Sequence, residues 1–344
     1  MPLSAILNNK PIYGFNFSPK EWSELKEMYR GQALSMYCCG NKARPKTSKL
    51  GTQFFSHVRR GECDSVAESE DHLTLKNMVA KVAIEAGWDV TSEYRGETPD
   101  GEKWVADVHC RKDTKEMVFE IQWSPQSYEE YERRTQKYLS SGIQRCAWLC
   151  RDYKYKENAF PETFETPCFG MSGKSGKYMV SKFDVDVETF LKGMFNRKLK
   201  WLPVKGQKLV CYAFYNTSLC TRCGGQNNYF CNLHVYSPEG HCLAEELYFN
   251  YGTSTQELIE ANVTTEQLLQ HQIGSLHHIY DKRAGYAFMA HGCLYCNGIK
   301  CNHTYRYDYH SDKSRAIRFE ATYDPELLYI SQKWFFTKRI DNID

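Results

Sequence analysis

The fold of this chain is decided by Lys103-Trp-Val-Ala-Asp107-Val-His-Cys110 and, shortly after it, Met117-Val-Phe-Glu120-Ile-Gln122-Trp123. Both segments are rich in apolar and β-branched residues, and Asp113-Thr114 marks a turn between them, so we expect two adjacent strands. Successive side chains of a strand point to opposite faces, which puts Glu120 and Gln122 on the same face. A hairpin would bring Asp107 beside them. Two carboxylates at one edge of a sheet would make an oxygen-ligand site that suits Mg²⁺ or Mn²⁺.

The segments around this hairpin predict one α/β unit. Its expected order is helix, three strands, helix and strand, at residues 69–86, 88–94, 103–110, 117–123, 127–139 and 146–150. Because a helix connects the last two strands, we expect them to run parallel in one sheet. Pro99-Asp100 is followed by Gly101 and is expected to be a turn, so we favour Asp107 as the candidate ligand.

The composition is that of a globular protein with more than one domain. The chain has 344 residues, of which 42% are hydrophobic and 25% charged, enough for two or three cores. We expect a basic N-terminal module at 1–65, the α/β core at 66–150, a linker and helix at 151–200, and a cysteine-rich domain of α+β type at 201–344. There is no apolar run of about eighteen residues and no basic, apolar leader, so we expect a cytoplasmic protein without membrane contact.

Hydrolysis of a phosphodiester bond is the chemistry that this hairpin would suit. Divalent ions held by carboxylates can activate a water and neutralise the charge of the transition state, with Asp107 and Glu120 as the ligands. Gln122 shares the face of Glu120, so it could position the attacking water but would add no charge. The alternative is a pair of exposed carboxylates on an edge hairpin, because this spacing is common by chance.

The start of the first helix supplies further candidates. Glu68, His72 and Lys76 are four residues apart and therefore lie on one face of that helix. Glu68 could add a carboxylate to the metal site, His72 could carry a proton or bind phosphate, and Lys76 could contact a phosphate at a helix N-terminus. The alternative is a capping cluster followed by a helix-surface charge series.

Several motifs in this order resemble the CoiA-like competence-protein family over residues 35–200. They are Gln53-Phe54-Phe55-Ser56-His57, Glu68-Ser69-x-x-His72-Leu73-x-x-Lys76, Ala106-Asp107-Val108, Glu120-Ile121-Gln122-x-Ser124, Arg134-Thr135-x-x-Tyr138 and Trp148-Leu149. The resemblance implies a restriction-endonuclease-like core of the PD-(D/E)xK superfamily, in which the last position of this family is characteristically Gln.

The same resemblance assigns roles to individual residues. It implies that Asp107 and Glu120 are metal ligands and that Glu68 and His72 belong to the catalytic site. It also implies that Arg134, on the helix after the hairpin, lies close enough to meet a phosphate.

The C-terminal domain carries two cysteine pairs, Cys220-Thr-Arg-Cys223 and Cys293-Leu-Tyr-Cys296. Two C-x₂-C pairs predict a tetrahedral zinc site, and Gly224-Gly225 gives the first pair the freedom to turn its amides toward the sulfurs. Such a closed shell would be structural. The alternative is four cysteines in a core, and a helix is expected at 255–278 between the pairs.

The N-terminal module carries weaker signals. Arg59 and Arg60 end a stretch of basic residues with no acid between them, which fits phosphate contact or a solvated face. Cys38, Cys39, His57 and Cys63 could bind metal, but adjacent cysteines are not a C-x₂-C pair, so we expect a degenerate or absent zinc site. The chain has 15 cysteines, which in a reducing compartment are expected to be free thiols and metal ligands.

Together these features predict a Mg²⁺- or Mn²⁺-dependent deoxyribonuclease in DNA processing or anti-phage defence, with a structural Zn²⁺. DNA is the expected partner, RNA remains open, and a protein partner or a homo-oligomer is compatible with the sequence. The alternative is a nucleic-acid-binding adaptor with an inert nuclease fold, working in DNA uptake or recombination. A third reading is an effector nuclease that needs a partner for activation.

Overall fold

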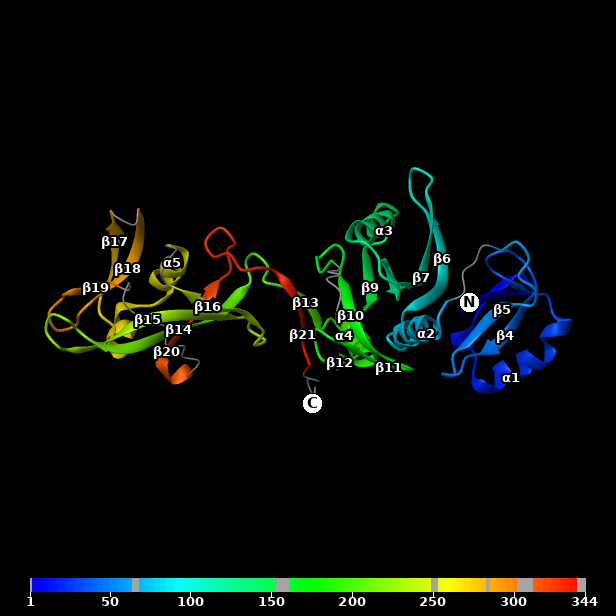
Figure 1. The fold of residues 1–344 in the computed structure, drawn as a ribbon, viewed down its shortest axis with the longest axis horizontal. Coiled ribbons are helices and arrows are strands. Elements are labelled where there is room, and N and C mark those ends of the chain that lie inside the picture. The colour runs from blue at the N-terminus through cyan, green and yellow to red at the C-terminus, as the bar shows by residue number, and fades with distance from the viewer. Residues whose placement is uncertain are drawn as a thin grey trace. The chain divides into compact units, whose positions relative to one another are not determined.

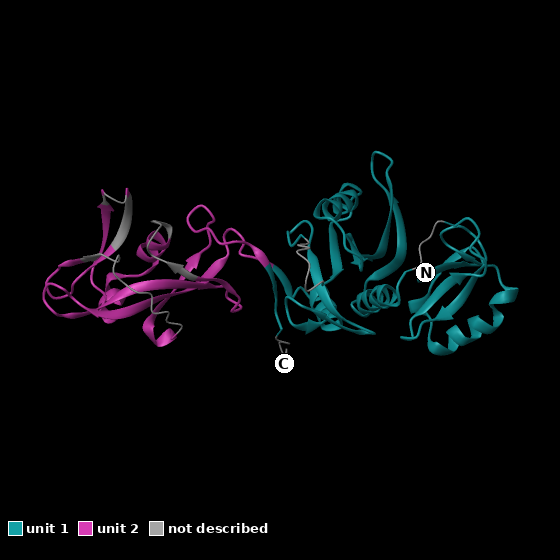
Figure 2. Ribbon diagram, in the orientation of Figure 1, with its two compact units in different colours: residues 1–200, 334–344 teal, residues 201–333 magenta. Residues whose placement is uncertain are grey.

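The computed structural model describes residues 2–63, 68–152, 161–248, 253–282, 285–301 and 312–338. The chain divides into two compact units (Figure 2), the first containing Met1–Lys200 with Trp334–Asp344 and the second containing Trp201–Lys333. Among the described helices, none combines the length and the apolar composition needed to cross a membrane.

The first unit begins with a small module built around Trp22. Its elements are β1 (Ser4–Leu7), β2 (Lys10–Tyr13), α1 (Pro19–Met28), β3 (Leu34–Met36), β4 (Ala43–Thr47) and β5 (Gln53–His57). β2, β1 and β3 form an antiparallel sheet, and β4 pairs with β5 as a hairpin. Ser18 caps α1 by accepting a hydrogen bond from the backbone of Glu21. Trp22 then packs edge-on against Phe55 of the hairpin, which closes this small core.

The α/β core follows in the predicted order of elements. It consists of α2 (Glu70–Glu85), β6 (Asp89–Glu97), β7 (Lys103–Lys112), β8 (Lys115–Gln122), α3 (Tyr128–Ser140) and β9 (Arg145–Arg151). Ser69 caps α2 by accepting from the N–H of His72, and Gly87 follows the helix with a φ of +76°. β6, β7 and β8 are antiparallel, whereas β9 is parallel to β8 because α3 connects them.

The residues expected to form a linker extend this sheet instead. β10 (Cys168–Lys174) runs parallel to β9, β11 (Lys177–Val180) turns back, and β12 (Val185–Asp186) precedes α4 (Val187–Phe195). The sheet has seven strands in the order β12-β11-β10-β9-β8-β7-β6 (Figure 1). The glycines that suggested a linker serve the tight β10–β11 connection, where Gly173 and Gly176 have φ values of +111° and +86°.

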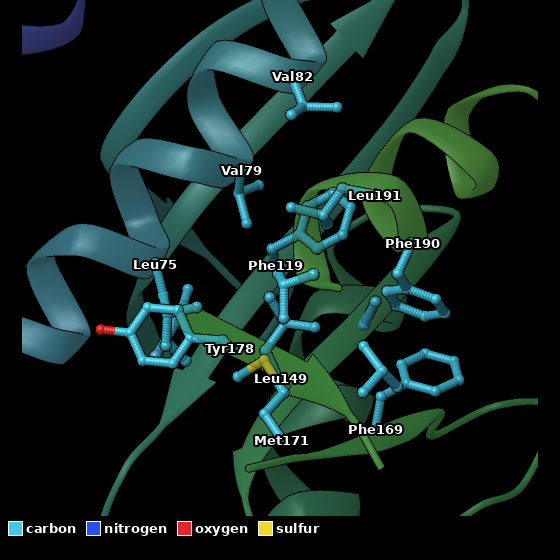
Figure 3. Close-up of a cluster of buried hydrophobic side chains, with 14 of the residues drawn as sticks. Leu75, Val79, Val82, Phe119, Leu149, Phe169, Met171, Tyr178, Phe190 and Leu191 are labelled. Atoms are coloured by element: carbon cyan, nitrogen blue, oxygen red, sulfur yellow. The ribbon is translucent and has the colours of Figure 1, made fainter. Parts of the chain in front are cut away.

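The two faces of the sheet are buried by different helices. Figure 3 shows side chains of α2, such as Val79, and of α4, such as Phe190, converging on Phe119 and Leu149 of the sheet. On the other face, tyrosines of α3 pack around the fully buried Trp148. The sheet is therefore a central layer that helices cover on both faces.

The second unit is rich in β-strands and has sheets of its own. β14 (Lys208–Leu219), β15 (Gln226–Tyr236), β16 (Cys242–Tyr248) and β20 (Ala316–Thr322) form one antiparallel sheet in the order β16-β15-β14-β20. β17 (Leu276–Asp281), β18 (Tyr286–Gly292) and β19 (Ile299–Cys301) form another. The single helix expected at 255–278 is replaced by α5 (Thr253–Asn262), α6 (Thr265–Gln270) and the start of β17, because Thr264 caps a new helix.

Two short strands complete the described chain. β13 (Leu199–Leu202) and β21 (Lys333–Phe336) form a two-stranded sheet. Phe336 packs with Phe190 of α4, so the last described residues contribute to the core of the first unit. We expected the cysteine-rich domain to continue to the end of the chain, but most of β21 belongs to the first unit.

Candidate active site and cysteine clusters

Asp107 lies at a break in the pairing of β7. The β7–β8 ladder ends with the pair Val108 and Phe119, so Asp107 lies just beyond it. Residues two apart in a regular strand point to the same face of the sheet. Ala106 packs on the α3 face and Val108 on the α2 face, so the alternation of side chains is interrupted at Asp107. The Asp107 carboxylate uses this break to accept the backbone N–H of Ile121 at 2.9 Å.

Three of the predicted site residues come together beside this break. Glu68, His72 and Asp107 each offer a ligand atom within 4.8 Å of the others. The closest contact joins His72 Nε2 and Asp107 Oδ2 at 3.2 Å. Because Ser69 caps the start of α2, the first turn of that helix places His72 beside Asp107 of β7. Carboxylate oxygens and an imidazole nitrogen are donors that could hold a divalent metal ion.

Lys76 occupies the interior of this site rather than its surface. Its side chain is fully buried, and its Nζ lies 3.1 Å from Glu68 Oε1, 2.5 Å from Glu93 Oε1 and 3.4 Å from Asp107 Oδ1. We expected Lys76 to contact a phosphate, but burial beneath three carboxylates leaves it no path to one. Three carboxylates facing one ammonium group leave two negative charges unbalanced when His72 is neutral.

Glu93 is the member of this site that the sequence reading missed. The sequence does carry a signal for it. The β6–β7 hairpin turns at Asp100-Gly101, and residues equally distant from Asp100 lie opposite each other. That rule places Glu93 opposite Asp107. Neither residue is paired in the β6–β7 ladder, and Glu93 has a φ of +51°, so its side chain leaves the normal alternation of the strand.

The charges around Asp107 favour its ionised form. Burial raises the pKa of this carboxyl, but Lys76, His72 and the N–H of Ile121 outweigh burial and hold it well below its usual range. Burial lowers the pKa of His72, and the neighbouring Asp107 more than compensates, so the pKa of His72 is raised. The site therefore combines a persistent carboxylate with an imidazole that readily holds a proton.

Glu120 faces α3 and has a different set of partners. Arg134 donates to Glu120 Oε2 at 2.6 Å, and the Tyr138 hydroxyl donates to Oε1. Arg134 and Tyr138 are one helical turn apart, so both reach the same carboxylate. Among the described residues, the group able to hold a metal does not include Glu120. Burial raises the pKa of Glu120 to about 7, against the opposing effect of Arg134.

The structure thus gives the two carboxylates that the sequence paired different hydrogen-bond partners. Glu120 belongs to an ion pair whose guanidinium also lies over the Trp148 ring, 4.7 Å from its centroid. Gln122 is half-buried and donates from Nε2 to the Ser124 carbonyl at 2.8 Å. Arg59 and Arg60 are exposed in the loop after β5, where Arg60 Nε donates to the carbonyl of Cys63.

The N-terminal cysteine cluster is more complete than we expected. Cys38, Cys39, His57 and Cys63 bring their ligand atoms within 4.8 Å of one another. Cys38 Sγ lies 3.8 Å from Cys39 Sγ and 3.6 Å from Cys63 Sγ. Zinc with Zn–S bonds of about 2.3 Å separates tetrahedral sulfurs by about 3.8 Å. The sequence predicts a degenerate or absent site, whereas in the structure the β4–β5 hairpin brings His57 to these cysteines and the group could hold a metal ion.

The second cluster joins the four predicted cysteines of the other unit. Cys220 and Cys296 sulfurs are 3.8 Å apart, and Cys223 and Cys293 sulfurs are 3.6 Å apart, again the edges of a zinc tetrahedron. Partial desolvation raises the pKa of Cys293, but N–H donors, including that of Tyr295, lower it to about 6. The thiolate is the form of cysteine that binds metal, and the lowered pKa of Cys293 favours this form. Both cysteine clusters could hold a structural metal ion.

Comparisons with known proteins give similarities for parts of the chain. No curated protein matches the chain. A solved structure, "Crystal Structure of Protein of Unknown Function AF1548", is 16% identical with a TM-score of 0.21, over 25% of this chain and 49% of that one. The chain thus spans about half the length of that protein.

A family comparison covers the site itself. Residues 68–192 match the family described as competence protein CoiA, nuclease-like domain. The matched segment runs from Glu68, before α2, into α4, and it therefore includes the strands that we had expected to be a linker. This segment of the chain is therefore similar to a nuclease-like domain of the CoiA competence-protein family.

Proposed function

We propose that this protein is a metal-dependent nuclease that hydrolyses phosphodiester bonds of DNA beside Asp107 of β7. The observation that carries the proposal is the group of Glu68, His72 and Asp107 around a buried ammonium, inside a segment that matches a nuclease-like family. A divalent cation would balance the two excess carboxylate charges if His72 releases its proton. Mg²⁺ and Mn²⁺ fit the oxygen-rich donor set.

The bound ion would activate a water and neutralise charge on the phosphate. Asp107 and Glu68 would hold it, and His72 would accept or return a proton. Gln122 would orient the water by hydrogen bonds. Lys76 would lie beneath the two ligand carboxylates and balance part of their negative charge.

Arg134 links substrate binding to the remaining ligand. A DNA phosphate that pairs with its guanidinium would compete with Glu120 for the same donors. Glu120 would then be free to join Asp107 at the metal. Arg59 and Arg60 would add phosphate contacts from the exposed loop after β5, and their contribution would decline as salt rises.

Cleavage of plasmid and of single-stranded DNA with Mn²⁺ or Mg²⁺ tests this proposal. We expect the wild type to cut, and Asp107→Asn to lose at least about a hundredfold in rate because it loses the charge that holds the ion. Glu116→Gln is the matched control, since Glu116 is a carboxylate of the neighbouring strand β8 and bonds to His109 at 3.1 Å, outside the group of Glu68, His72 and Asp107. If wild type and Asp107→Asn cut equally, the nuclease proposal is wrong.

One observation favours a second function, that of a nucleic-acid-binding adaptor. Both oxygens of Glu120 are engaged by Arg134 and Tyr138, and such a carboxylate is not available to a metal until they release it. An adaptor would bind DNA with strong salt dependence and show no cleavage under any divalent ion. Binding assays beside the cleavage assay separate the two functions.

We further propose that zinc fills both cysteine clusters as a structural ion. Each cluster supplies four ligands, which leaves no open position for a reacting water. The spacing of the sulfurs supports this assignment, and the two ions would stabilise the N-terminal module and the second unit separately.

A further inference from the structure

The carboxylate of Glu93 connects the N-terminal strand β1 to the candidate metal site. Its Oε1 accepts the backbone N–H of Leu3 at 3.1 Å and lies 2.5 Å from Lys76 Nζ. Its Oε2 accepts the N–H of Ser4 at 3.1 Å and the hydroxyl of Ser92 at 2.7 Å. Four donors thus converge on one side chain, and two of them come from residues almost ninety positions away in the sequence.

The conformation of Glu93 indicates that this arrangement is held in place by its contacts. A φ of +51° is disfavoured for a residue with a side chain, and it persists where surrounding contacts fix it. Leu3 and Ser4 are fully buried, and Leu3 packs with Leu73 and Ala80 of α2, the helix that carries Lys76. β1 is therefore attached both to Glu93 and to the helix beside it.

The distances around Lys76 show which carboxylate holds it most closely. Its ammonium is 2.5 Å from Glu93, compared with 3.1 Å from Glu68 and 3.4 Å from Asp107. Glu68 and Asp107 are the residues that would ligate a cation, and Glu93 is not among that group. A lysine without Glu93 would have only those two ligand carboxylates as partners.

We propose that Glu93, held by β1, is a positioning residue that keeps the Lys76 ammonium from competing with a divalent cation for Glu68 and Asp107. This inference rests on the proposed metal site and deepens it. It makes the N-terminal strand a part of the nuclease site, although β1 lies outside the segment that matches the nuclease-like family.

Calorimetric titration of the full chain with Mn²⁺ alone tests the inference. We expect Glu93→Gln to weaken Mn²⁺ binding by at least about tenfold, the scale seen when a partner of a metal ligand is lost. Lys76→Met should bind at least as tightly as the wild type. The double variant should return to within about threefold of the wild type, because it has no ammonium to compete. Glu116→Gln should bind as the wild type does.

A second readout separates positioning from a general loss of structure. In the cleavage assay, excess Mn²⁺ should restore the Glu93→Gln rate to near the wild-type kcat, since only occupancy of the site is impaired. If Glu93→Gln does not fold, judged by circular dichroism, Glu93→Asp with and without Lys76→Met provides the same comparison through a shortened side chain.

The outcomes distinguish this inference from the proposed function. If the wild type binds no Mn²⁺, the nuclease proposal fails and this inference fails with it. If the wild type binds Mn²⁺ and Glu93→Gln binds equally well, only the inference is overturned. A double variant as weak as Glu93→Gln also overturns it, because competition by Lys76 would not be the cause.

Discussion

At Asp107 a local change in strand pairing determines what the side chain can do. Inside a regular ladder, the backbone N–H groups of the neighbouring strand are bonded to backbone carbonyls. At the break, the Asp107 carboxylate accepts the N–H of Ile121 and also contacts His72 and Lys76. The sequence proposes Asp107 and the helix residues as candidates from their local spacing, and the structure brings Glu68, His72 and Asp107 together. The sequence does not reveal that Lys76 is buried, since a lysine at that position of a helix is equally compatible with solvent.

Lys76→Met should strongly destabilise the metal-free protein at pH 7. The substitution leaves Glu68, Glu93 and Asp107 facing one another without their shared cation, and removing one partner of a buried ion pair costs about 3–5 kcal/mol. Urea denaturation in the presence of a chelator measures the change. If the free energy of unfolding falls by less than about 1 kcal/mol, the Lys76 ammonium is not the main group that neutralises these three carboxylates.

Glu120 should make stability depend on pH in metal-free buffer. Its folded pKa, about 7, is above the ordinary value of 4.5, so the folded state binds this proton more tightly than the unfolded state. The contribution to stability is fully present below about pH 4.5 and is lost as pH rises through about 7. Glu120→Gln cannot ionise and should not show this loss.

The measurement is urea denaturation of the wild type and Glu120→Gln from pH 4.5 to 8. The variant should gain about 1–3 kcal/mol relative to the wild type over this window, at 1.4 kcal/mol for each unit of pKa difference. If the free energy of unfolding has the same pH dependence in both proteins, then Arg134 and Tyr138 fully offset the effect of burial on the Glu120 carboxylate. Activity measured with Mn²⁺ is expected to fall in the same variant, because the amide cannot replace an anionic ligand.

At the scale of elements, the start of α2 is fixed from two sides. Glu70 Oε1 accepts the N–H of Leu50 from the N-terminal module at 2.8 Å. Asp71 Oδ1 accepts the N–H of Ser175 at 3.2 Å and the hydroxyl of Tyr178 at 2.5 Å, both from the β10–β11 hairpin. Acidic residues near a helix N-terminus are favourable in themselves, and here they also connect His72 and its helix to distant strands.

The β10–β11 hairpin explains why part of the fold was unpredictable. Local alternation was enough to predict β7, β8 and the helices beside them, and the parallel β9 followed from the intervening helix. Residues 161–186 gave no such pattern, because Gly173 and Gly176 read as linker residues while in the structure they allow a tight reversal. The hairpin is stabilised because β10 pairs in parallel with β9. That pairing joins segments that are not adjacent in the sequence, so local patterns do not reveal it.

Gly173→Ala should destabilise the protein through this hairpin. Gly173 has a φ of +111°, and a Cβ there would lie 2.1 Å from the carbonyl oxygen of Lys177, so the backbone must move. We expect a loss of about 2–4 kcal/mol, mostly from strain at a positive φ and a broken strand pair. Gly176→Ala is the control, because it has a φ of +86° but nothing within 4 Å, and it should cost about 1 kcal/mol. Equal effects in thermal denaturation would contradict the steric argument.

At the scale of the whole molecule, each unit has its own core and its own cysteine cluster. Cys38, Cys39, His57 and Cys63 belong to the first unit, and the two C-x₂-C pairs belong to the second. The sequence predicted the second cluster from its spacing alone. It named the four residues of the first as a possible site but could not show that they converge, because the pairing of β4 with β5 brings His57 to the cysteines.

Elemental analysis of the purified chain should therefore find two zinc ions. Cys220→Ser and Cys63→Ser should each lose one ion, since a tetrahedral site rarely keeps zinc after losing a thiolate ligand. One ion in the wild type, lost only in Cys220→Ser, would remove the N-terminal site from this description. Cys211→Ser is a suitable control, because Cys211 is a buried cysteine of β14 outside both clusters, and it should keep both ions.

Removal of zinc from the second unit should leave the α/β core folded. The Cys220 cluster joins the β14–β15 turn to the β18–β19 turn, so losing its ion should release those strands from each other. The seven-stranded sheet has a separate apolar core, centred on residues such as Phe119 and Leu149, and no cysteine of that cluster contributes to it. Hydrogen exchange of Cys220→Ser should show faster exchange in residues 208–236 and 276–301 and unchanged protection in β8 and β9. Loss of protection in both regions would mean that the two units unfold as one cooperative domain.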